Sequence, residues 1–489
     1  MTSRRALSYL ACLLLPWLLG LAGCATNPVT GSSDFVLMSE EQEIALGRQY
    51  HPQVLKEMPR YEDPALTAYV QRVGERLVPH SHRPNLIYRF TVLDSQDVNA
   101  FALPGGYIYI TRGLLAYLNS EAELAAVLGH ELGHVTARHS VRQHSAATAT
   151  GLLGAVIAGA SGVQGAGDLA QIAGTAFVRG YGREHELEAD RLGAEYLARS
   201  SYDPQAMLRV IGVLKDQETF ELQRAKEEGR EPRVYHGLFS THPANDTRLQ
   251  EAIAAAGQYA SPAANARQSE EFLRKIDGLT FGDGEREGIR RGNRFYHRAL
   301  DFTLEFPSGW RIDNRPASLM AQSGDNQGMM QFSMQDLNKR VPPQTFLRER
   351  LKLADLRNGE PITHAGMQGY TGIAEQDTPF GRLPVRFAVL YRGDQALIFA
   401  GLSKARGQPY RHDAELLQTV RSFRGLTADE QALAQPQRIR ILRAGPATRF
   451  ADLARSSAIP NHPEAQLRLL NGRYPQGEPT PGESLKIVR

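Results

Sequence analysis

The chain has 489 residues, which is too long for one ordinary domain and predicts two to four domains. With 42% hydrophobic and 22% charged residues, the composition is that of a globular protein and has no extreme bias. The net charge of +3 is close to balance at this length and argues neither for nor against binding of nucleic acid. We expect no nucleic-acid partner.

The N-terminus has the pattern of an export signal. Arg4 and Arg5 precede an apolar run over residues 6–21, which is short and ends at a processing site, unlike a membrane-spanning helix. The following Leu21-Ala22-Gly23-Cys24 matches the lipobox of bacterial lipoproteins, whose cysteine is diacylated and becomes the first residue. The alternative is an ordinary signal peptide that contains a cysteine by chance.

The lipobox implies that residues 1–23 are a signal peptide and that Cys24 is lipidated, with residues 24–34 as a tether. Several acyl chains hold a protein stably at a membrane, whereas one does not. Because Ala25 rather than Asp follows the cysteine, the resemblance further implies a lipoprotein of the outer membrane that faces the periplasm. The other cysteine, Cys12, lies in the signal, so the mature chain would have no disulfide.

Residues 35–256 are predicted to form the first folded domain, mainly helical with a small sheet. A helix is expected after Ser39, which forms a capping-box pattern with Gln42. Strands are expected at 88–93 and at 107–111, where the sequence alternates Tyr-Ile-Tyr-Ile, and the Pro-Gly-Gly between them indicates a turn.

An H-E-x-x-H motif lies in the next predicted helix, which has Ser120 as its N-cap and Glu123 at the capping-box position. Residues four apart lie on one helix face, so His130 and His134 can direct their imidazoles at one metal ion. Glu131 would lie near the water activated there, and it could move the water's proton to the leaving amine. The alternative is a surface helix that carries two histidines.

A third metal ligand is expected on a later helix. Ala137 and Ser140 stand where a metzincin has Gly and His, so the ligand is not a histidine of that kind. Glu186 would complete a His₂Glu site for one zinc ion per chain and leave the fourth position to water. Asp190, four residues later, would accept a hydrogen bond from a ligand imidazole, whereas Glu188 is expected to be a solvated acid.

Together these motifs resemble the HtpX/BepA-like zinc metallopeptidases, gluzincins related to the CAAX prenyl endopeptidases. The resemblance rests on residues 99–106, the H-E-x-x-H helix and Tyr181-Gly182-Arg183, and it covers about residues 35–255. HtpX and the prenyl endopeptidases are integral membrane proteins, but no segment after the signal has the pattern of a spanning helix. The chain is therefore most similar to the periplasmic BepA branch, although it lacks BepA's helical repeat tail.

The resemblance also assigns roles near the cleft. In gluzincins an edge strand beside the zinc helix pairs with extended substrate, and Tyr107, Ile108 and Tyr109 are expected to do so; a plain core strand is the alternative.

A Thr-His-Pro segment with a later arginine resembles a His-Pro segment of the family. His242 is expected to gate the open metal position or to contact the oxyanion, and Arg248 to stabilise that oxyanion or to pair with Asp190. A helix-entry turn with a satisfied histidine is the equally weighted alternative. Four other histidines are expected to be structural or exposed: His139, His144, His185 and His236.

The Ala/Gly-rich segment over residues 146–176 is expected to form two closely packed helices. A membrane-contacting hairpin and a flap over the cleft are the alternatives.

Downstream, a connector over residues 257–299 is expected to lead to an α+β domain at 300–426 and then to a linker at 427–437. Residues 302–307, followed by Gly309-Trp310, resemble the opening of PsbP-like domains. The whole chain is thus predicted to be an α+β multidomain protein.

Residues 438–489 resemble a LysM module, a βααβ fold that binds N-acetylglucosamine polymers. The resemblance implies peptidoglycan as a candidate partner, but Ala444 to Thr448 depart from the usual Gly-Asp-Thr opening.

The function expected from these patterns is a zinc endopeptidase that cleaves unfolded or assembling envelope proteins at the periplasmic side of the outer membrane. The alternative is a chaperone-like or peptidoglycan-binding lipoprotein with a gated or silent zinc site. Intact Glu131 favours the enzyme, because a purely structural site has no need of it. Peptidoglycan hydrolysis is a weaker third hypothesis.

Overall fold

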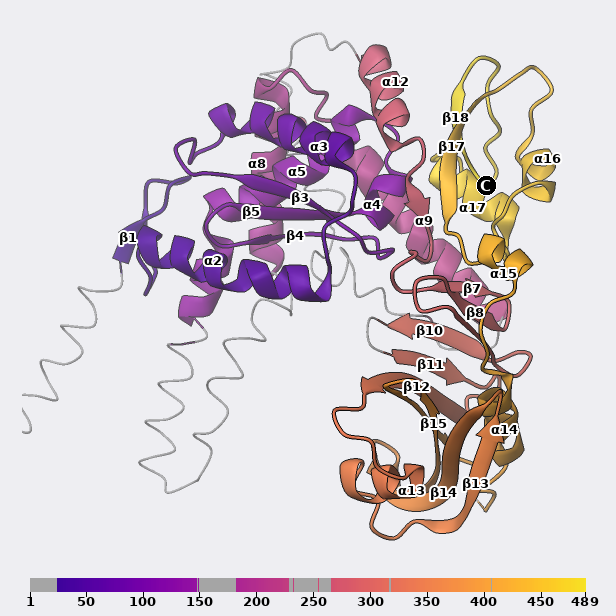
Figure 1. The fold of residues 1–489 in the computed structure, drawn as a ribbon. Coiled ribbons are helices and arrows are strands. Elements are labelled where there is room, and N and C mark those ends of the chain that lie inside the picture. The colour runs from indigo at the N-terminus through magenta and orange to yellow at the C-terminus, as the bar shows by residue number, and fades with distance from the viewer. Residues whose placement is uncertain are drawn as a thin grey trace, which may run out of the picture. The chain divides into compact units, whose positions relative to one another are not determined.

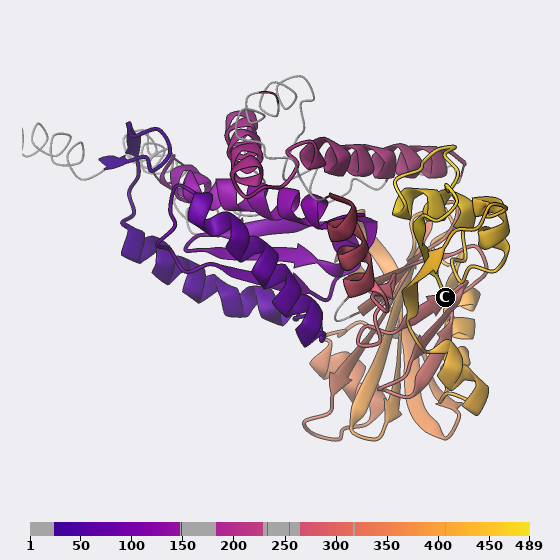
Figure 2. The ribbon, with the colours of Figure 1, turned by 90° about the horizontal axis from the view of Figure 1, so that it is seen from above.

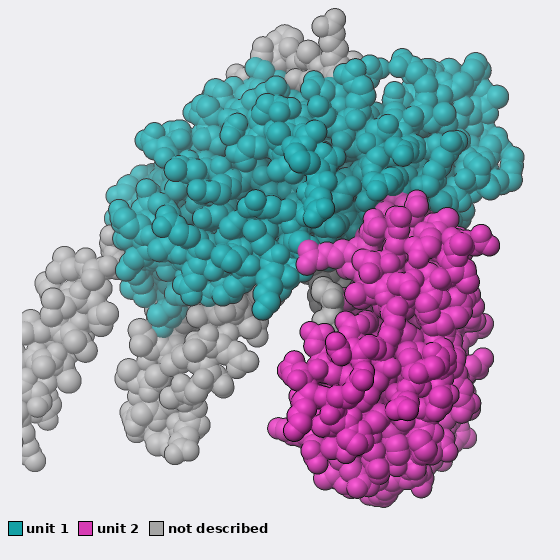
Figure 3. All heavy atoms as spheres, in the orientation of Figure 1, with its two compact units in different colours: residues 1–281, 438–489 teal, residues 282–437 magenta. Residues whose placement is uncertain are grey.

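A computed structural model of the chain describes residues 24–146, 148, 182–227, 232, 254, 265–315, 318–405 and 407–489. The chain divides into two compact units, residues 1–281 with 438–489 and residues 282–437 (Figure 3). The first is mainly helical and the second is rich in sheet, so the predicted α+β multidomain architecture is confirmed. The predicted signal peptide and nearly all of the Ala/Gly-rich segment lie outside the described residues.

The first unit is built around a small sheet whose strand order is β3-β5-β4. The three strands are β3 Arg89–Leu93, β4 Ala100–Leu103 and β5 Tyr107–Thr111 (Figure 1). β5 is parallel to β3 and antiparallel to β4, so it is the central strand. The prediction that Tyr107, Ile108 and Tyr109 form a substrate-binding edge is therefore wrong, and the core-strand alternative is right.

Both faces of β5 are covered, which explains its uniformly apolar sequence. Ile108 and Ile110 belong to the large core cluster that includes side chains of α3 (Pro64–Leu77) and α5 (Glu121–Thr136). Tyr107 and Tyr109 belong instead to a second cluster with side chains of α2 (Glu40–Glu57). The alternating tyrosines and isoleucines of β5 are therefore buried on opposite faces of the sheet, and neither face of this strand is exposed to solvent.

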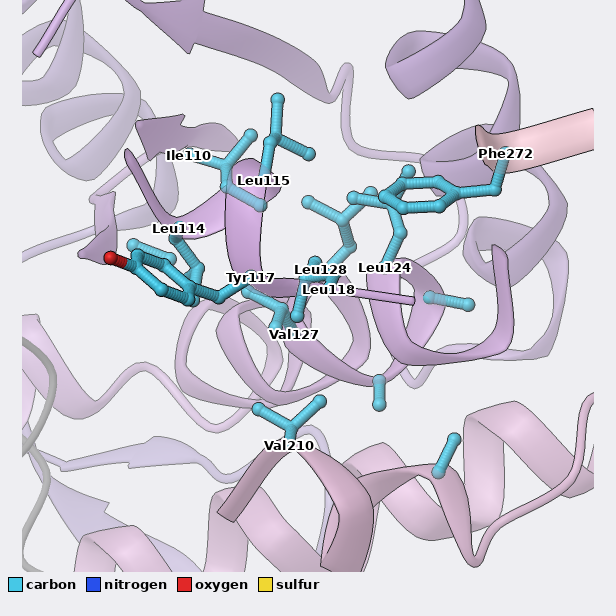
Figure 4. Close-up of a cluster of buried hydrophobic side chains, with 14 of the residues drawn as sticks. Ile110, Leu114, Leu115, Tyr117, Leu118, Leu124, Val127, Leu128, Val210 and Phe272 are labelled. Carbon is cyan, nitrogen blue, oxygen red and sulfur yellow. The ribbon is translucent and has the colours of Figure 1, made fainter. Parts of the chain in front are cut away.

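Helices from distant parts of the chain complete the large core. In Figure 4, Leu124, Val127 and Leu128 of α5 lie among the buried side chains that also include Val210 and Phe272. Val210 belongs to α9 (Ala206–Glu227) and Phe272 to α12 (Asn265–Ile276). Other described elements of this region include β1 Cys24–Thr26, β2 Ser33–Phe35, α4 Arg112–Tyr117, α8 Arg183–Arg199 and β6 Thr280–Phe281.

The predicted turn and one predicted capping box are confirmed. Gly105 and Gly106 have φ values of 77° and 89°, a conformation that favours glycine at both positions. A Cβ on Gly105 would also lie 2.7 Å from the Cα of Ile44, so this position has no room for a side chain. Ser39 and Gln42 cap α2 reciprocally.

The second capping box is shifted by one residue. Ser120 accepts the backbone N–H of Glu123 as expected. The Glu123 carboxylate, however, accepts the backbone N–H of Asn119 at 2.7 Å rather than that of the N-cap residue.

Residues 438–489 have the predicted order of strand, two helices and strand, but they pack into the first unit. Their elements are β17 Gln437–Arg443, α16 Phe450–Arg455, α17 Pro463–Leu470 and β18 Ser484–Val488. β18, β17 and β6 form one sheet, and α17 lies against α9 (Figure 1, Figure 2). Buried side chains of this segment belong to the same core cluster as α5, so the segment is a part of the first unit.

Lys486, a buried residue of β18, caps the C-terminal end of α4. The Lys486 Nζ donates hydrogen bonds to the carbonyls of Ala116, at 2.8 Å, and of Leu118, at 2.7 Å, at the C-terminal end of α4. Burial lowers the pKa of Lys486 to about 7, while the charge of Glu123 opposes this shift. A cation at a helix C-terminus also interacts favourably with the helix dipole.

The second unit contains a seven-stranded antiparallel sheet in the order β10-β11-β12-β16-β15-β14-β13 and a three-stranded sheet in the order β7-β8-β9. Its strands are β7 Ile289–Arg291, β8 Arg294–His297, β9 Phe302–Glu305, β10 Arg311–Arg315, β11 Ser318–Gln322, β12 Gly328–Asp336, β13 Arg357–His364, β14 Met367–Thr378, β15 Gly381–Arg392 and β16 Gln395–Ser403. Its α-helices are α13 Pro343–Thr345, α14 Asp413–Ser422 and α15 Ala428–Leu433.

The predicted boundaries of this unit need correction at both ends. β7 and β8 pair with β9, so residues 289–297 belong to the sheet and not to a connector. α15 forms within the predicted linker 427–437, because Thr427 and Glu430 make a capping box. None of the helices in the described ranges has the length and apolarity needed to cross a bilayer.

We expect Lys486→Met to lower the free energy of unfolding of the first unit by about 1–3 kcal/mol, because the carbonyls of Ala116 and Leu118 would be buried without this donor. Thermal and urea unfolding would measure the change. Lys56→Met is the matched control, since Lys56 is an exposed lysine of the same unit. Equal stability of the two variants would contradict the role of Lys486.

Candidate metal centre

Glu121 fixes the start of the helix that carries the H-E-x-x-H motif. It is buried in the first turn of α5, where an acidic side chain suits the helix dipole. Its carboxylate accepts hydrogen bonds from the hydroxyls of Tyr69 and Tyr202, both at 2.7 Å, and from Arg76 at 2.6 Å. These partners come from α3 and from the loop after α8, so the network ties α5 to both.

Small residues let α5 and α8 approach closely along the motif. A Cβ on Gly133 would lie 2.9 Å from the carbonyl oxygen of Ala189, and one on Gly193 would lie 3.0 Å from the backbone nitrogen of His130. A side chain at Gly133 would force a shift of one of the two helices, and one at Gly193 would leave an unusually tight contact. This close packing brings the Glu186 side chain of α8 against the histidines of α5.

Three donor side chains converge at this contact. The Nε2 atoms of His130 and His134 are 3.0 Å apart, and each lies 3.5 Å from a different oxygen of Glu186. A tetrahedral zinc ion with bonds of about 2.0–2.2 Å would hold such donors roughly 3.3 Å apart. The three residues are the group in the described part of the chain that could hold a metal ion, and their chemistry fits zinc.

Asp190 lies where the sequence places it. Its Oδ1 accepts a hydrogen bond from the Nδ1 of His130 at 2.9 Å. With its proton on Nδ1, His130 presents the lone pair of Nε2 to the Glu186 side of the site.

His134 has a different partner, which sequence reasoning missed. Its Nδ1 lies 2.8 Å from the Nδ1 of His139, and the Nε2 of His139 lies 3.1 Å from an oxygen of Glu188. Arg142 donates to the same oxygen at 2.9 Å. His139 is fully buried, and Glu188 is held by His139 and Arg142, so the prediction of Glu188 as a solvated acid is wrong.

A two-residue turn after α5 places His139, the first residue of the next helical segment, beside the site. α5 ends at Thr136, and Arg138 has φ of 56°. The Nε of Arg138 pairs with the buried carboxylate of Glu43 at 2.9 Å, which holds the turn. Helical spacing cannot find a residue beyond such a turn. The sequence signal for this contact is the presence of another histidine five residues after His134.

The pKa directions follow from these contacts. Burial lowers the pKa of His130, but hydrogen bonds to Asp190 and Glu186 outweigh it and raise the pKa well above its ordinary value. The hydrogen bond from His139 is the main cause that lowers the pKa of Glu188 to about 2. Burial lowers the pKa of His139 and takes that of His185, which stacks on His139 with ring centroids 4.4 Å apart, to about 4.

The other predicted site residues have different outcomes. Glu131 is completely buried on α5 beside the two histidines. His242 and Arg248 lie outside the described residues, so their gating or oxyanion roles stay predictions. Cys24 is the first residue of β1, which pairs with β2, and its lipidation also stays a prediction.

Comparison with known proteins gives a family match. The model of peptidase family M48 matches residues 64–256. The beta-barrel assembly-enhancing protease of Yersinia pestis is 34% identical over 244 residues, which are 47% of this chain and 47% of that protein. The protein of the same name from Escherichia coli K12 is 34% identical over 244 residues, 48% of this chain and 47% of its own length. The chain thus spans about half the length of these relatives.

A solved structure, cyanobacterial PsbP (CyanoP) from Synechocystis, overlaps 28% of this chain and 96% of its own, with a TM-score of 0.23 and 13% identity. A similarity this low carries no argument about the fold, so the PsbP-like character of the second unit stays a prediction.

The affinity for zinc should fall as the pH is lowered through the raised pKa of His130, because a proton and the metal ion compete for the same nitrogen. Above that pKa the nitrogen is free to bind. Competition titrations with a chelating dye at several pH values would measure this. Asp190→Asn should move the dependence to lower pH. An affinity that does not change with pH would contradict the prediction.

Proposed function

We propose that this chain, whose residues 64–256 match the model of peptidase family M48, is a zinc-dependent endopeptidase of the bacterial envelope. The observation that carries the proposal is the convergence of His130, His134 and Glu186, with Glu131 buried on the same helix. A structural zinc site uses four protein ligands, whereas three ligands leave a position for water or substrate. Among the residues that the structure describes, the site therefore has the ligand set of a catalytic centre.

Each residue has a distinct task in peptide hydrolysis. His130, His134 and Glu186 would hold the ion, which when bound supplies a Lewis acid for the scissile carbonyl and makes water more acidic. Glu131 would accept a proton from the attacking water and deliver it to the leaving amine. Asp190 would keep the proton of His130 on Nδ1, so that Nε2 stays available as a ligand.

The edge strand for substrate would be β4 instead of β5. β4 pairs on one side with β5 and lies at the edge of the described sheet. The backbone N–H of Thr111 donates to the carbonyl of Asn99, so hydrogen-bonded pairs alternate from there and Ala100 and Ala102 point their backbone groups away from β5. Ala100 and Ala102 are buried, with 0% and 7% of their surface exposed, so an extended peptide would pair with these groups only after displacing the side chains that cover them.

Several features support an envelope location. The N-terminal pattern ends in the lipobox at Cys24. The relatives are named beta-barrel assembly-enhancing proteases. We therefore propose unfolded or assembling envelope proteins as substrates, at the periplasmic face of the outer membrane.

The direct test uses the chain from Cys24 onward, prepared with Ala at position 24 to avoid acylation. The parent should bind about one zinc ion and cleave casein. Glu131→Gln should keep the zinc and lose at least about 10²-fold in kcat/KM, and Glu186→Ala should lose both zinc and cleavage. A parent that binds zinc and retains unfolded protein without cutting it would favour the chaperone-like alternative. A parent without zinc would overturn the proposal.

Ala102→Pro tests the substrate strand. Proline removes the N–H that points away from β5 and keeps the ladder between the two strands. We expect kcat/KM to fall about tenfold, the worth of one hydrogen bond, with zinc content unchanged. Ala102→Gly is the control, because it loses the methyl group but keeps the N–H. A folded Ala102→Pro variant with parental activity would exclude β4 as the substrate strand.

A further inference from the structure

The two histidines of the metal centre are held by different partners. The Nδ1 of His130 meets a carboxylate directly, at 2.9 Å from Asp190. The Nδ1 of His134 meets a second imidazole, at 2.8 Å from the Nδ1 of His139. An imidazole is an ambiguous partner, because each of its nitrogens can donate or accept. The direction of this hydrogen bond must therefore be decided elsewhere.

Glu188 decides it. An ionised carboxylate accepts hydrogen bonds and donates none, so the Nε2 of His139, 3.1 Å away, must carry a proton. A neutral His139 with its proton on Nε2 has a lone pair on Nδ1 and can only accept there. His134 then donates from Nδ1, and its Nε2 is left with a lone pair that faces Glu186 and the Nε2 of His130.

The opposite arrangement would disable the ligand. If His139 donated from Nδ1, its Nε2 lone pair would face the carboxylate of Glu188, and His134 would carry its proton on Nε2. That nitrogen could then not bind a metal ion, because a histidine ligand must be unprotonated at the bound nitrogen. We call the hydrogen bonds from His134 to His139 and from His139 to Glu188 the row. The direction of donation along this row thus selects the tautomer of His134 that can bind a metal ion.

The surroundings keep Glu188 in place and charged. Arg142 donates to the same carboxylate oxygen at 2.9 Å, and its Nε also lies 3.4 Å from Asp34 of β2. His139 is completely buried and stacks on His185, so it has little freedom to turn its ring. The row of hydrogen bonds is therefore fixed at both ends.

We propose that His139 and Glu188 are positioning residues of the metal centre, which hold His134 in the tautomer that presents its Nε2 to the ion. They act through His134 and touch neither substrate nor metal. The inference rests on the metal site of the proposed function, but not on peptide hydrolysis. The quantities it sets are the affinity for zinc and the rate at which zinc leaves.

Two substitutions test the row at different points. His139→Phe keeps a ring over His185 but removes both nitrogens. Glu188→Gln keeps the shape but can donate to His139 from its amide, which removes the selection of the tautomer. We expect each to weaken zinc binding by at least about tenfold and to speed its dissociation, as loss of such partners does in other zinc sites. Competition with a chelating dye and release to excess chelator would measure both.

Glu195→Gln is the matched control. Glu195 lies on the same helix, is about as buried as Glu188 and pairs with Arg199 at 2.7 Å, but no hydrogen bond links it to a histidine of the site. It should keep the parental zinc affinity. Thermal unfolding of each variant without zinc shows whether the fold is kept.

The double variant separates a relay from two independent structural effects. If His139 and Glu188 act in one row, His139→Phe with Glu188→Gln should weaken zinc binding no more than His139→Phe alone. Additive losses, or folded single variants with parental affinity and dissociation rate, would overturn the proposal. A parent that binds zinc without cleaving casein would overturn the proposed peptidase activity and leave this test valid. A parent that binds no zinc would overturn both.

Discussion

The close packing of α5 against α8 is the constraint on which the metal centre depends. Neither helix alone carries a complete ligand set, because His130 and His134 lie on one and Glu186 on the other. The two backbones approach until a Cβ on Gly133 would lie 2.9 Å from the carbonyl of Ala189. Such an approach is open only to glycine, and it sets the 3.5 Å spacing between the Glu186 oxygens and the two imidazoles. The glycine within the H-E-x-x-H motif therefore serves the geometry of the site as much as the ligands do.

The same packing gives each ligand histidine its own partner on α8. Asp190 lies one turn after Glu186 and reaches His130 directly. Glu188 points to the other side of the helix and reaches His134 only through His139. One helix thus supplies a ligand and two carboxylates that orient the other ligands. This arrangement places three acidic side chains within five residues, which is tolerated because each has a basic or metal-binding partner.

Local spacing made part of this site predictable. His130, His134, Glu186 and Asp190 could be placed from the sequence because residues four apart share a helix face. His139 could not, since it follows the positive φ of Arg138, and Glu188 could not be assigned without it. β5 was misplaced at the edge because an alternating Tyr-Ile pattern does not say which strands flank it. Strand neighbours and the contacts of the C-terminal segment depend on long-range packing, which local patterns do not encode.

The C-terminal segment shows how such packing changes the meaning of a recognised pattern. Residues 438–489 have the element order of a LysM module, which by itself would suggest a module that folds separately. Here Tyr474 lies against Phe220 and donates to Gln223 of α9, and Lys486 reaches the end of α4. α17 also contacts α9 and α4, so this segment packs on the rest of the first unit along α17, at Tyr474 and at the end of β18. Through the hydrogen bonds of Lys486 to the carbonyls of Ala116 and Leu118, the segment also supports the connection that leads into α5, the helix that carries two of the metal ligands.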